Sequence, residues 1–255
     1  MIHRTALIDE TAELGRNVKV GPYSIIGPGV TIGDDTVIGP HAVIKGPTVI
    51  GKGNEIFQFT SIGEDCQDKK YQGEPTRLEI GDNNVIREHV TIHRGTVQDQ
   101  GLTKIGDNNL FMVAVHVAHD CVIGSDNIFA NTCGIAGHVH IGDGVLLGGM
   151  TGVHQFCNIG SYAMTAGCSL VLKDVPAYVM VGGNPAAARS MNFEGMRRRG
   201  WSAEVIKQLR NAYKVVYRQG NTLEEAIALL EQSSPGPELE RFIQSLRKST
   251  RGITR

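Results

Sequence analysis

The 255-residue sequence is poor in aromatic side chains and contains no long apolar segment. Phe, Trp and Tyr together make up 5% of the residues. Proteins that bind single-stranded nucleic acids stack the bases on aromatic rings. This shortage therefore argues against nucleic acid as a partner, as does the absence of a known nucleic-acid-binding motif. A transmembrane helix needs about 20 consecutive apolar residues, and no stretch of this chain supplies them, so we expect no membrane insertion.

Cysteine is also scarce, with five residues whose spacing fits no metal site. Such usage is typical of a reducing compartment. We therefore expect a cytoplasmic protein with neither a cofactor nor a resident metal. The repeat described next begins at Ile2, so we also expect no signal peptide.

A six-residue repeat dominates the sequence instead. Branched aliphatic residues occupy every sixth position from Ile2 to Ile62, eleven in succession. The pattern resumes at Ile80, shifts its phase once before Ile105, and fades after Val171. Glycine often follows the aliphatic residue, and a small or β-branched residue usually lies four positions after it.

A period of six fits neither an amphipathic helix nor the two-residue alternation of a strand. It predicts a short strand and a turn, three of which close a triangular coil, as in the hexapeptide class of parallel β-helix. The aliphatic side chain points inward, and Cys121, Cys133 and Cys157 take the small interior position. We expect a mainly β fold with a left-handed parallel β-helix over residues 1–189, the hand being that of the hexapeptide class.

Helical signals replace the repeat from about residue 190. Ser202 is expected to cap a helix that stops at Gly220, and Thr222 forms a capping box with Glu225 for a second helix. A third follows after Pro235. We therefore expect a C-terminal α-helical domain over residues 190–255, which also covers the open end of the β-helix.

Charge is divided unevenly between these two parts. Residues 190–255 hold 12 Lys and Arg against 7 Asp and Glu, whereas residues 1–189 hold 13 against 19. A basic helical domain indicates an acidic partner or a phosphorylated ligand. Two polar insertions, at residues 63–79 and 98–104, interrupt the repeat, and insertions of this kind often present binding residues.

Four histidines and one aspartate stand out within the repeat. His116 and His119 occupy neither interior position, so both should point outward. Asp120 can hold a histidine in one tautomer and raise its basicity, as a general base near neutral pH requires. His138 and His154 follow His119 by 19 and 35 residues, each within one residue of whole 18-residue coils. They should extend a row of histidines along one face.

The same residues leave other interpretations open. Histidines on neighbouring coils can bind zinc, as in the β-helical carbonic anhydrases, or can decorate a non-catalytic scaffold. A nucleophilic mechanism is disfavoured, because no exposed Ser or Cys lies at an evident spacing from His119. Taken singly, His89, His93 and His140 are interpreted as surface side chains.

Several longer sequence motifs, which the six-residue repeat does not require, are similar to those of a known family. The chain resembles the bacterial UDP-N-acetylglucosamine O-acyltransferases over its whole length, apart from a local variation at Asp65-Cys66. The strings that carry the resemblance are Ser61-Ile-Gly-Glu, Gln67-Asp68, Gly73-Glu-Pro-Thr-Arg, Thr91-Ile-His-Arg-Gly-Thr-Val, Ala118-His-Asp-Cys, Gly148-Gly-Met-Thr, Val153-His-Gln-Phe-Cys, Asn192-Phe-Glu-Gly and Arg198-Arg-Gly.

The resemblance implies transfer of an (R)-3-hydroxyacyl group from acyl carrier protein to the 3-hydroxyl of UDP-N-acetylglucosamine, the first step of lipid A synthesis. By resemblance, His119 is the general base, Asp120 orients it, and the Gly137 N–H stabilises the oxyanion. It also implies a homotrimer with active sites between subunits and a carrier protein that docks near the basic domain.

The resemblance further implies a set of substrate-binding residues. The sugar and acyl pocket would be lined by Gln67, Asp68, Lys70, His116, His138, His154 and Gln155. The nucleotide would be held by Asn192, Glu194, Arg198 and Arg199. Glycine at position 167 would leave room for a longer acyl chain than a bulky residue there. Some relatives use a 3-amino sugar as acceptor, and no residue of this chain decides between the two. The related N-acyltransferase of lipid A synthesis is disfavoured, because it carries a separate domain before its β-helix.

Overall fold

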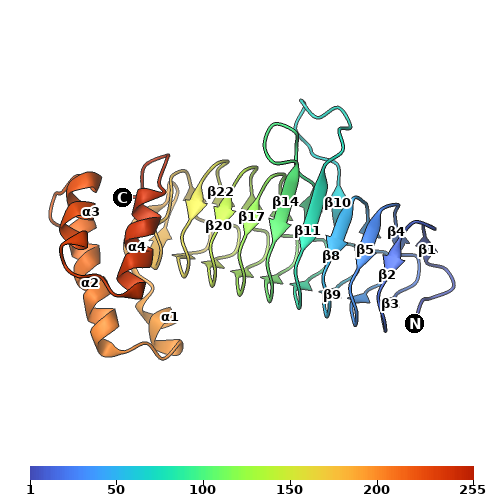
Figure 1. The fold of residues 1–255 in the computed structure, drawn as a ribbon, viewed down its shortest axis with the longest axis horizontal. Coiled ribbons are helices and arrows are strands. Elements are labelled where there is room, and N and C mark those ends of the chain that lie inside the picture. Colours follow the sequence, from blue (N-terminus) through green and yellow to red (C-terminus); the bar gives the residue numbers. More distant parts are fainter.

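The computed structural model describes residues 1–255 as a long three-sided prism, closed at its C-terminal end by helices (Figure 1). Each coil contributes one short strand to each of three sheets. The first sheet contains β1 (Leu7–Ile8), β4 (Ile25–Ile26), β7 (Val43–Ile44), β10 (Ser61–Glu64), β13 (Thr91–His93), β16 (His116–Val117), β19 (Gly134–Ile135), β22 (Gly152–Val153) and β25 (Leu170–Val171).

The other two faces repeat this order. The second sheet contains β2 (Glu13–Leu14), β5 (Val30–Ile32), β8 (Thr48–Ile50), β11 (Arg77–Ile80), β14 (Leu102–Ile105), β17 (Val122–Ile123), β20 (His140–Ile141) and β23 (Asn158–Ile159). The third contains β3 (Lys19–Val20), β6 (Val37–Ile38), β9 (Glu55–Ile56), β12 (Val85–Ile86), β15 (Leu110–Phe111), β18 (Ile128–Phe129), β21 (Leu146–Leu147), β24 (Met164–Thr165), β26 (Val179–Gly182) and β27 (Ala187–Met191).

The strands pair in parallel along each face, apart from β27, which is antiparallel to β26. Coils without an insertion align residues 18 apart, as in the pairing of Leu7 with Ile25. From Val20 onward the aliphatic positions of the repeat are buried in one continuous core, because every sixth side chain points into the prism. The expected left-handed parallel β-helix is confirmed.

A residue with positive φ turns the chain at most corners of the prism. We call the corner after the first sheet the first corner and the corner after the third sheet the third corner. Asp120 (φ 57°) and His138 (φ 61°) occupy this position on successive coils of the first corner. Aspartate tolerates the left-handed region better than most residues, and histidine is also enriched there.

Both insertions leave the prism at the first corner and project from it as loops (Figure 1). The first runs between β10 and β11, and the second between β13 and β14. The strands resume in register after each loop, so that Ile80 of β11 still pairs with Ile105 of β14. The insertions therefore add surface without disturbing the core.

Asparagines line the interior of the second corner, where the sequence pattern had indicated only small or β-branched residues. The backbone N–H of Asn84 donates to Asn54 Oδ1, that of Asn109 to Asn84 Oδ1, and that of Asn127 to Asn109 Oδ1, each at 2.9 Å. Because each amide oxygen accepts from the coil that follows, these bonds tie the coils together, and Asn127 Nδ2 is the one amide nitrogen of the four without a partner.

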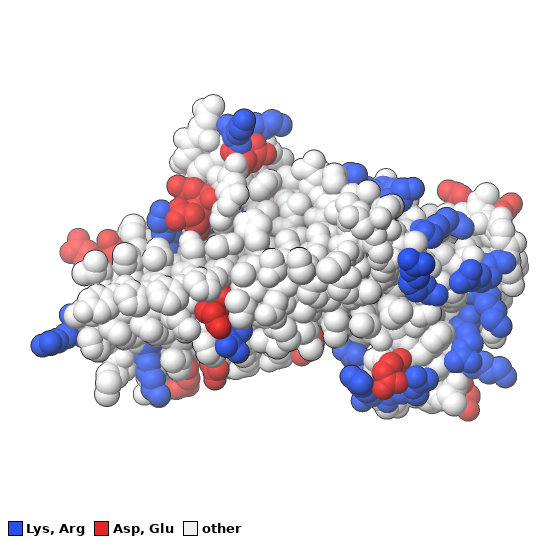
Figure 2. All heavy atoms as spheres, turned by 180° about the vertical axis from the view of Figure 1, so that it is seen from behind, with Lys and Arg blue, Asp and Glu red and all other residues white.

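Four helices complete the chain: α1 (Phe193–Arg198), α2 (Ala203–Tyr217), α3 (Leu223–Glu231) and α4 (Pro237–Arg247). The Ser202 cap and the Thr222–Glu225 capping box are confirmed. Leu239, Phe242 and other apolar residues of the helices join the core of the prism. Lys and Arg gather over this helical end (Figure 2). None of the four helices combines the length and apolar character needed to span a bilayer.

Candidate active site

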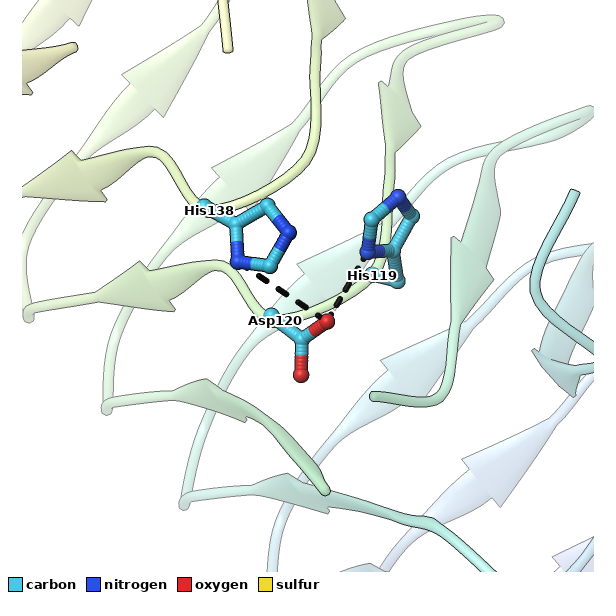
Figure 3. Close-up of side chains that lie close together, drawn as sticks. All are labelled: His119, Asp120 and His138. Carbon is cyan, nitrogen blue, oxygen red and sulfur yellow. Dashed lines mark hydrogen bonds and ion pairs between the residues drawn. The ribbon is translucent and has the colours of Figure 1, made fainter. Parts of the chain in front are cut away.

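His119 and Asp120 form a hydrogen-bonded pair at the first corner (Figure 3). His119 Nδ1 donates to Asp120 Oδ2 at 2.8 Å. The side chain of His119 is 14% exposed, whereas that of Asp120 is 1% exposed. The pair therefore presents one imidazole nitrogen, Nε2, to the surface and keeps its carboxylate in the protein, an arrangement suited to a general base.

Asp120 is held by two threonines as well as by His119. Thr96 donates to it from its backbone N–H (2.9 Å) and from its hydroxyl (2.6 Å), and the Asp120 N–H donates to Thr103 Oγ1 (2.8 Å). Burial alone would raise the pKa of the Asp120 carboxyl. The hydrogen bonds from His119 and Thr96 outweigh burial and hold this pKa below its usual range. Asp120 is thus an anion fixed in place beside the imidazole.

His138 lies one coil further along the same corner. Its ring meets the ring of His119 edge to face, with centroids 5.0 Å apart, and stacks on Phe156 at 4.4 Å. His138 Nδ1 lies 2.8 Å from Asp99 Oδ2 and 3.9 Å from Asp120 Oδ2. The expected neighbourhood of His119 and His138 on one face is confirmed.

Gly137 lies directly beside the His119 ring, one coil above it. A Cβ at Gly137 would be only 2.6 Å from His119 Cε1 and Nε2, so only glycine lets the imidazole occupy this place. Unlike its neighbour His138, whose N–H donates to His119 O (3.0 Å), Gly137 makes no backbone N–H hydrogen bond within the chain.

A groove of about 480 Å³ runs along the first face beside these residues. Four further residues implied by the resemblance line it: Gln67, Asp68, His116 and His154. His116 Nδ1 is bonded to Thr91 Oγ1 at 2.7 Å. Burial, and then the neighbouring His119, lower the pKa of His116. A polar pocket of the same volume adjoins the groove and contains Lys70, Gln155 and His138 together with Asp68.

The four nucleotide-binding candidates converge elsewhere on the chain. Asn192, Glu194, Arg198 and Arg199 line a cavity of about 600 Å³ over the third face. Asn192 caps α1, and Glu194 pairs with Arg198 at 3.2 Å. No residue is shared between this cavity and the groove of His119. Gly167 lies at the third corner and lines neither of them.

The interpretation of His93 as a surface side chain is wrong. His93 is 4% exposed, meets His116 edge to face at 5.0 Å, and lines the groove. Burial and the neighbouring His116 lower its pKa to about 4, so it is neutral at pH 7. His93 directly follows the interior residue Ile92 at the end of β13. The second insertion begins after it, so the repeat does not predict that this side chain is buried.

Arg94 was also not foreseen as part of the site. Its side chain is 8% exposed and donates to Gly46 O (3.1 Å), Gly63 O (2.5 Å), the Asp65 carboxylate and Tyr71 Oη (3.2 Å). The first insertion, which carries Gln67, Asp68 and Lys70, is thereby fastened to the prism. A cationic residue directly after a histidine of the site was the available signal.

His119, Asp120 and His138 also form the one cluster whose side chains could hold a metal ion, with donor atoms within 4.8 Å of one another. His119 Nδ1 is hydrogen-bonded to the Asp120 carboxylate at 2.8 Å, an arrangement that suits proton transfer. A metal shared by the cluster would have to replace this hydrogen bond.

Two family models match the chain. Residues 11–46 match the bacterial transferase hexapeptide family (six repeats), and residues 174–254 match domain 2 of UDP-N-acetylglucosamine O-acyltransferase. Together with the left-handed β-helix and the His119–Asp120 pair, these matches place the chain among the acyltransferases built from hexapeptide repeats.

Full-length relatives make the assignment specific. The acyl-[acyl-carrier-protein]–UDP-N-acetylglucosamine O-acyltransferase of Pseudomonas putida is 62% identical over 251 residues, covering 98% of this chain and 97% of the relative. LpxA from Acinetobacter baumannii is 57% identical with a TM-score of 0.98, covering 100% and 99%. UDP-N-acetylglucosamine O-acyltransferase (LpxA) from Moraxella catarrhalis is 53% identical with a TM-score of 0.98 and the same coverage. The chain belongs to the UDP-N-acetylglucosamine O-acyltransferase family.

Proposed function

We propose that this enzyme transfers an (R)-3-hydroxyacyl group from acyl carrier protein to the 3-hydroxyl of UDP-N-acetylglucosamine, with His119 as the general base. The observation that carries the mechanism is the His119–Asp120 pair, in which a buried carboxylate fixes Nδ1 and leaves Nε2 facing the groove. Membership of the family supports the reaction, and the geometry of the pair supports the role of the histidine.

The proposed step balances as a direct transfer. His119 Nε2 takes the proton of the sugar hydroxyl while the hydroxyl oxygen attacks the thioester carbonyl. The tetrahedral oxyanion collapses, the carbon–sulfur bond breaks, and the carrier thiolate takes the proton from the imidazolium. Asp120 stabilises the imidazolium throughout, because its carboxylate stays ionised and bonded to Nδ1. No protein nucleophile is required, and Cys121 is buried in the core.

Gly137 is proposed as the oxyanion donor. Its N–H is free of partners within the chain, and its Cα adjoins the ring that receives the proton. A backbone donor placed beside the base can stabilise the charge that develops on the thioester oxygen.

The separation of the two cavities supports a homotrimer with composite sites. The groove of His119 lies on the first face and the cavity of Asn192, Arg198 and Arg199 over the third face. In the proposed trimer, one substrate would reach both cavities by bridging neighbouring chains. In this proposal, the arginines hold the phosphates of the nucleotide, while Asp68, Lys70, His138 and Gln155 surround the sugar.

The apolar floor of the groove suits the acyl chain. Ile135, Val153 and Leu170 line it, and Gly134 and Gly152 leave space because they carry no side chain. By resemblance, we also propose that the small residue Gly167, at the third corner and outside this groove, permits a longer acyl chain. The basic helical end supports docking of the acidic carrier protein there (Figure 2). The five free cysteines support the proposal that the enzyme acts in the reducing cytoplasm.

A transfer assay with purified protein tests the proposal. Hydroxyacyl carrier proteins of several chain lengths are offered with UDP-N-acetylglucosamine or with its 3-amino analogue. His119→Ala should lower kcat by about 10²-fold or more, which is the usual contribution of a general base, while far-UV circular dichroism and assembly are unchanged. Unaltered turnover would remove His119 from the chemistry. Preference for the amino analogue would reassign the acceptor, and loss of wild-type turnover on chelation would favour the metal alternative.

A further inference from the structure

The second insertion carries Asp99, whose carboxylate lies against His138. Asp99 Oδ2 is 2.8 Å from His138 Nδ1. The only other carboxylate within reach is Asp120, whose Oδ2 is 3.9 Å away and is already bonded to His119 and to the Thr96 hydroxyl. His138 Nδ1–H therefore donates its hydrogen bond to Asp99 and not to Asp120.

The loop that carries Asp99 is itself tied to the active site. Thr96 holds both oxygens of Asp120 through its N–H and its hydroxyl. Its carbonyl accepts from the N–H groups of Asp99 (3.3 Å) and Gly101 (3.0 Å), which closes a tight turn. This turn therefore contacts both histidine partners. Its first residue, Thr96, bonds to the Asp120 carboxylate beside His119, and its fourth residue, Asp99, bonds to the ring of His138.

These contacts leave His138 little freedom. Phe156 stacks on one side of its ring with an interplanar angle of 8°, and His119 meets it edge to face. Stacking fixes the plane of an imidazole but not which nitrogen carries the proton. That choice is made by the hydrogen bond to Nδ1, and here Asp99 provides it.

We propose that Asp99 is a positioning residue that holds His138 in its Nδ1–H tautomer, so that Nε2 is presented as an acceptor to the substrate. Without Asp99, the nearest carboxylate to His138 Nδ1 is that of Asp120, which lies 3.9 Å away and is already bonded to His119, so the Nδ1–H tautomer of His138 loses its acceptor. The proposal rests on the proposed function, because the polar pocket that His138, Lys70 and Gln155 share with Asp99 is assigned there to the sugar.

Five variants test the role by kinetics: three single substitutions in the loop, His138→Ala, and the double variant His138→Ala with Asp99→Ala. Asp99→Ala should lower kcat/KM for UDP-N-acetylglucosamine about tenfold, the scale of one charge-assisted hydrogen bond that is partly exposed. Asp99→Asn should stay within about threefold of wild type, since an amide oxygen accepts the same bond. Gln100→Ala, in the same turn and without side-chain partners, controls for disturbance of the loop. In a His138→Ala background, Asp99→Ala should cost nothing further.

Nitrogen-15 spectra of labelled histidine give a readout that does not depend on turnover. His138 should show the Nδ1–H tautomer in wild type and Asp99→Asn, and a shift toward the Nε2–H tautomer in Asp99→Ala. An unchanged His138 signal in Asp99→Ala, or an equal loss of activity in the presence and absence of His138, would overturn the proposal. If His119→Ala retains turnover, the proposed function fails, yet the His138 spectrum still decides whether Asp99 sets its tautomer.

Discussion

Two corners of the prism carry histidines, and only one of them is built for chemistry. At the third corner, Tyr23, His41, Phe59 and His89 stack ring on ring, with centroids 5.2 to 5.5 Å apart. These rings are exposed and the imidazoles make no hydrogen bonds. At the first corner, each of His119 and His138 meets a carboxylate at 2.8 Å.

The difference between the corners lies in the insertions. Both loops leave the first corner and none leaves the third. The second loop supplies Thr96 to Asp120 and Asp99 to His138, and the first supplies Gln67 and Asp68 to the groove. The repeated coil on its own yields a row of stacked side chains. Partners that control protons come in large part from outside the repeat.

The largest effect is expected when Asp120, the buried anion of the first corner, is replaced. Asp120→Asn should lower kcat by about 10²- to 10³-fold, because a neutral amide does not stabilise the imidazolium that forms on His119. His41→Ala at the third corner is the matched control and should leave kcat within error of wild type. Steady-state kinetics on both variants, with thermal unfolding to verify folding, makes the comparison. Equal effects of the two substitutions would contradict it.

A smaller effect is expected when the place of the His119 ring is filled. Gly137→Ala puts a Cβ 2.6 Å from the imidazole, so the ring must move away from the backbone donor, and kcat should fall about tenfold or more. Gly149→Ala, at the third corner, places its Cβ 3.4 Å from the nearest atom and should have little effect. The pair of kcat values decides whether the first corner has the stricter geometry.

The last prediction concerns the free energy of unfolding, not turnover, and its dependence on pH. Because burial lowers the pKa of His93 to about 4, the unfolded chain binds its proton more readily than the folded chain between about pH 6.5 and pH 4. The free energy of unfolding should therefore fall as the pH drops through this window, by up to about 3 kcal/mol from this residue. His93→Gln should flatten the dependence.

Denaturant unfolding at several pH values and at fixed protein concentration measures this dependence. His89→Gln, which removes an exposed imidazole from the third corner, is the control for loss of a histidine. If His93→Gln and wild type lose stability in parallel as the pH falls, burial of His93 does not contribute to acid sensitivity.

The repeat allowed the fold to be predicted in detail. From Val20 onward the periodic aliphatic residues are buried as predicted, and so are the core cysteines Cys121, Cys133 and Cys157, whereas Ile2 at the open end is 50% exposed. The caps at Ser202 and Thr222 lie where the sequence placed them. Periodicity works here because each position is defined by one short coil. The repeat did not predict the hydrogen bonds that join Asn54 to Asn127 through the stack. A single asparagine at an interior position is only a deviation from the pattern, and its bonds to the next coil are visible only in the structure.

The site was only partly predictable for the same reason. His119, Asp120 and His138 lie on the repeat, so their shared corner follows from the spacing. Thr96 and Asp99 lie in an insertion, where no period relates a residue to its neighbours in space, and their contacts depend on how the loop folds back. The sequence also could not predict that Arg198 and Arg199 line a different cavity from His119, because this depends on how the helical domain packs on the prism.

The in-register return of the strands after each loop has a further consequence. Since Ile80 still pairs with Ile105 across the second insertion, the length and composition of that segment can change while the packing beneath it stays the same. Selection can then alter which acceptor or acyl donor is favoured without lowering the melting temperature of the molecule. The trade-off between new activity and lost stability, which constrains enzymes whose sites are cut into their cores, is relaxed in such an architecture.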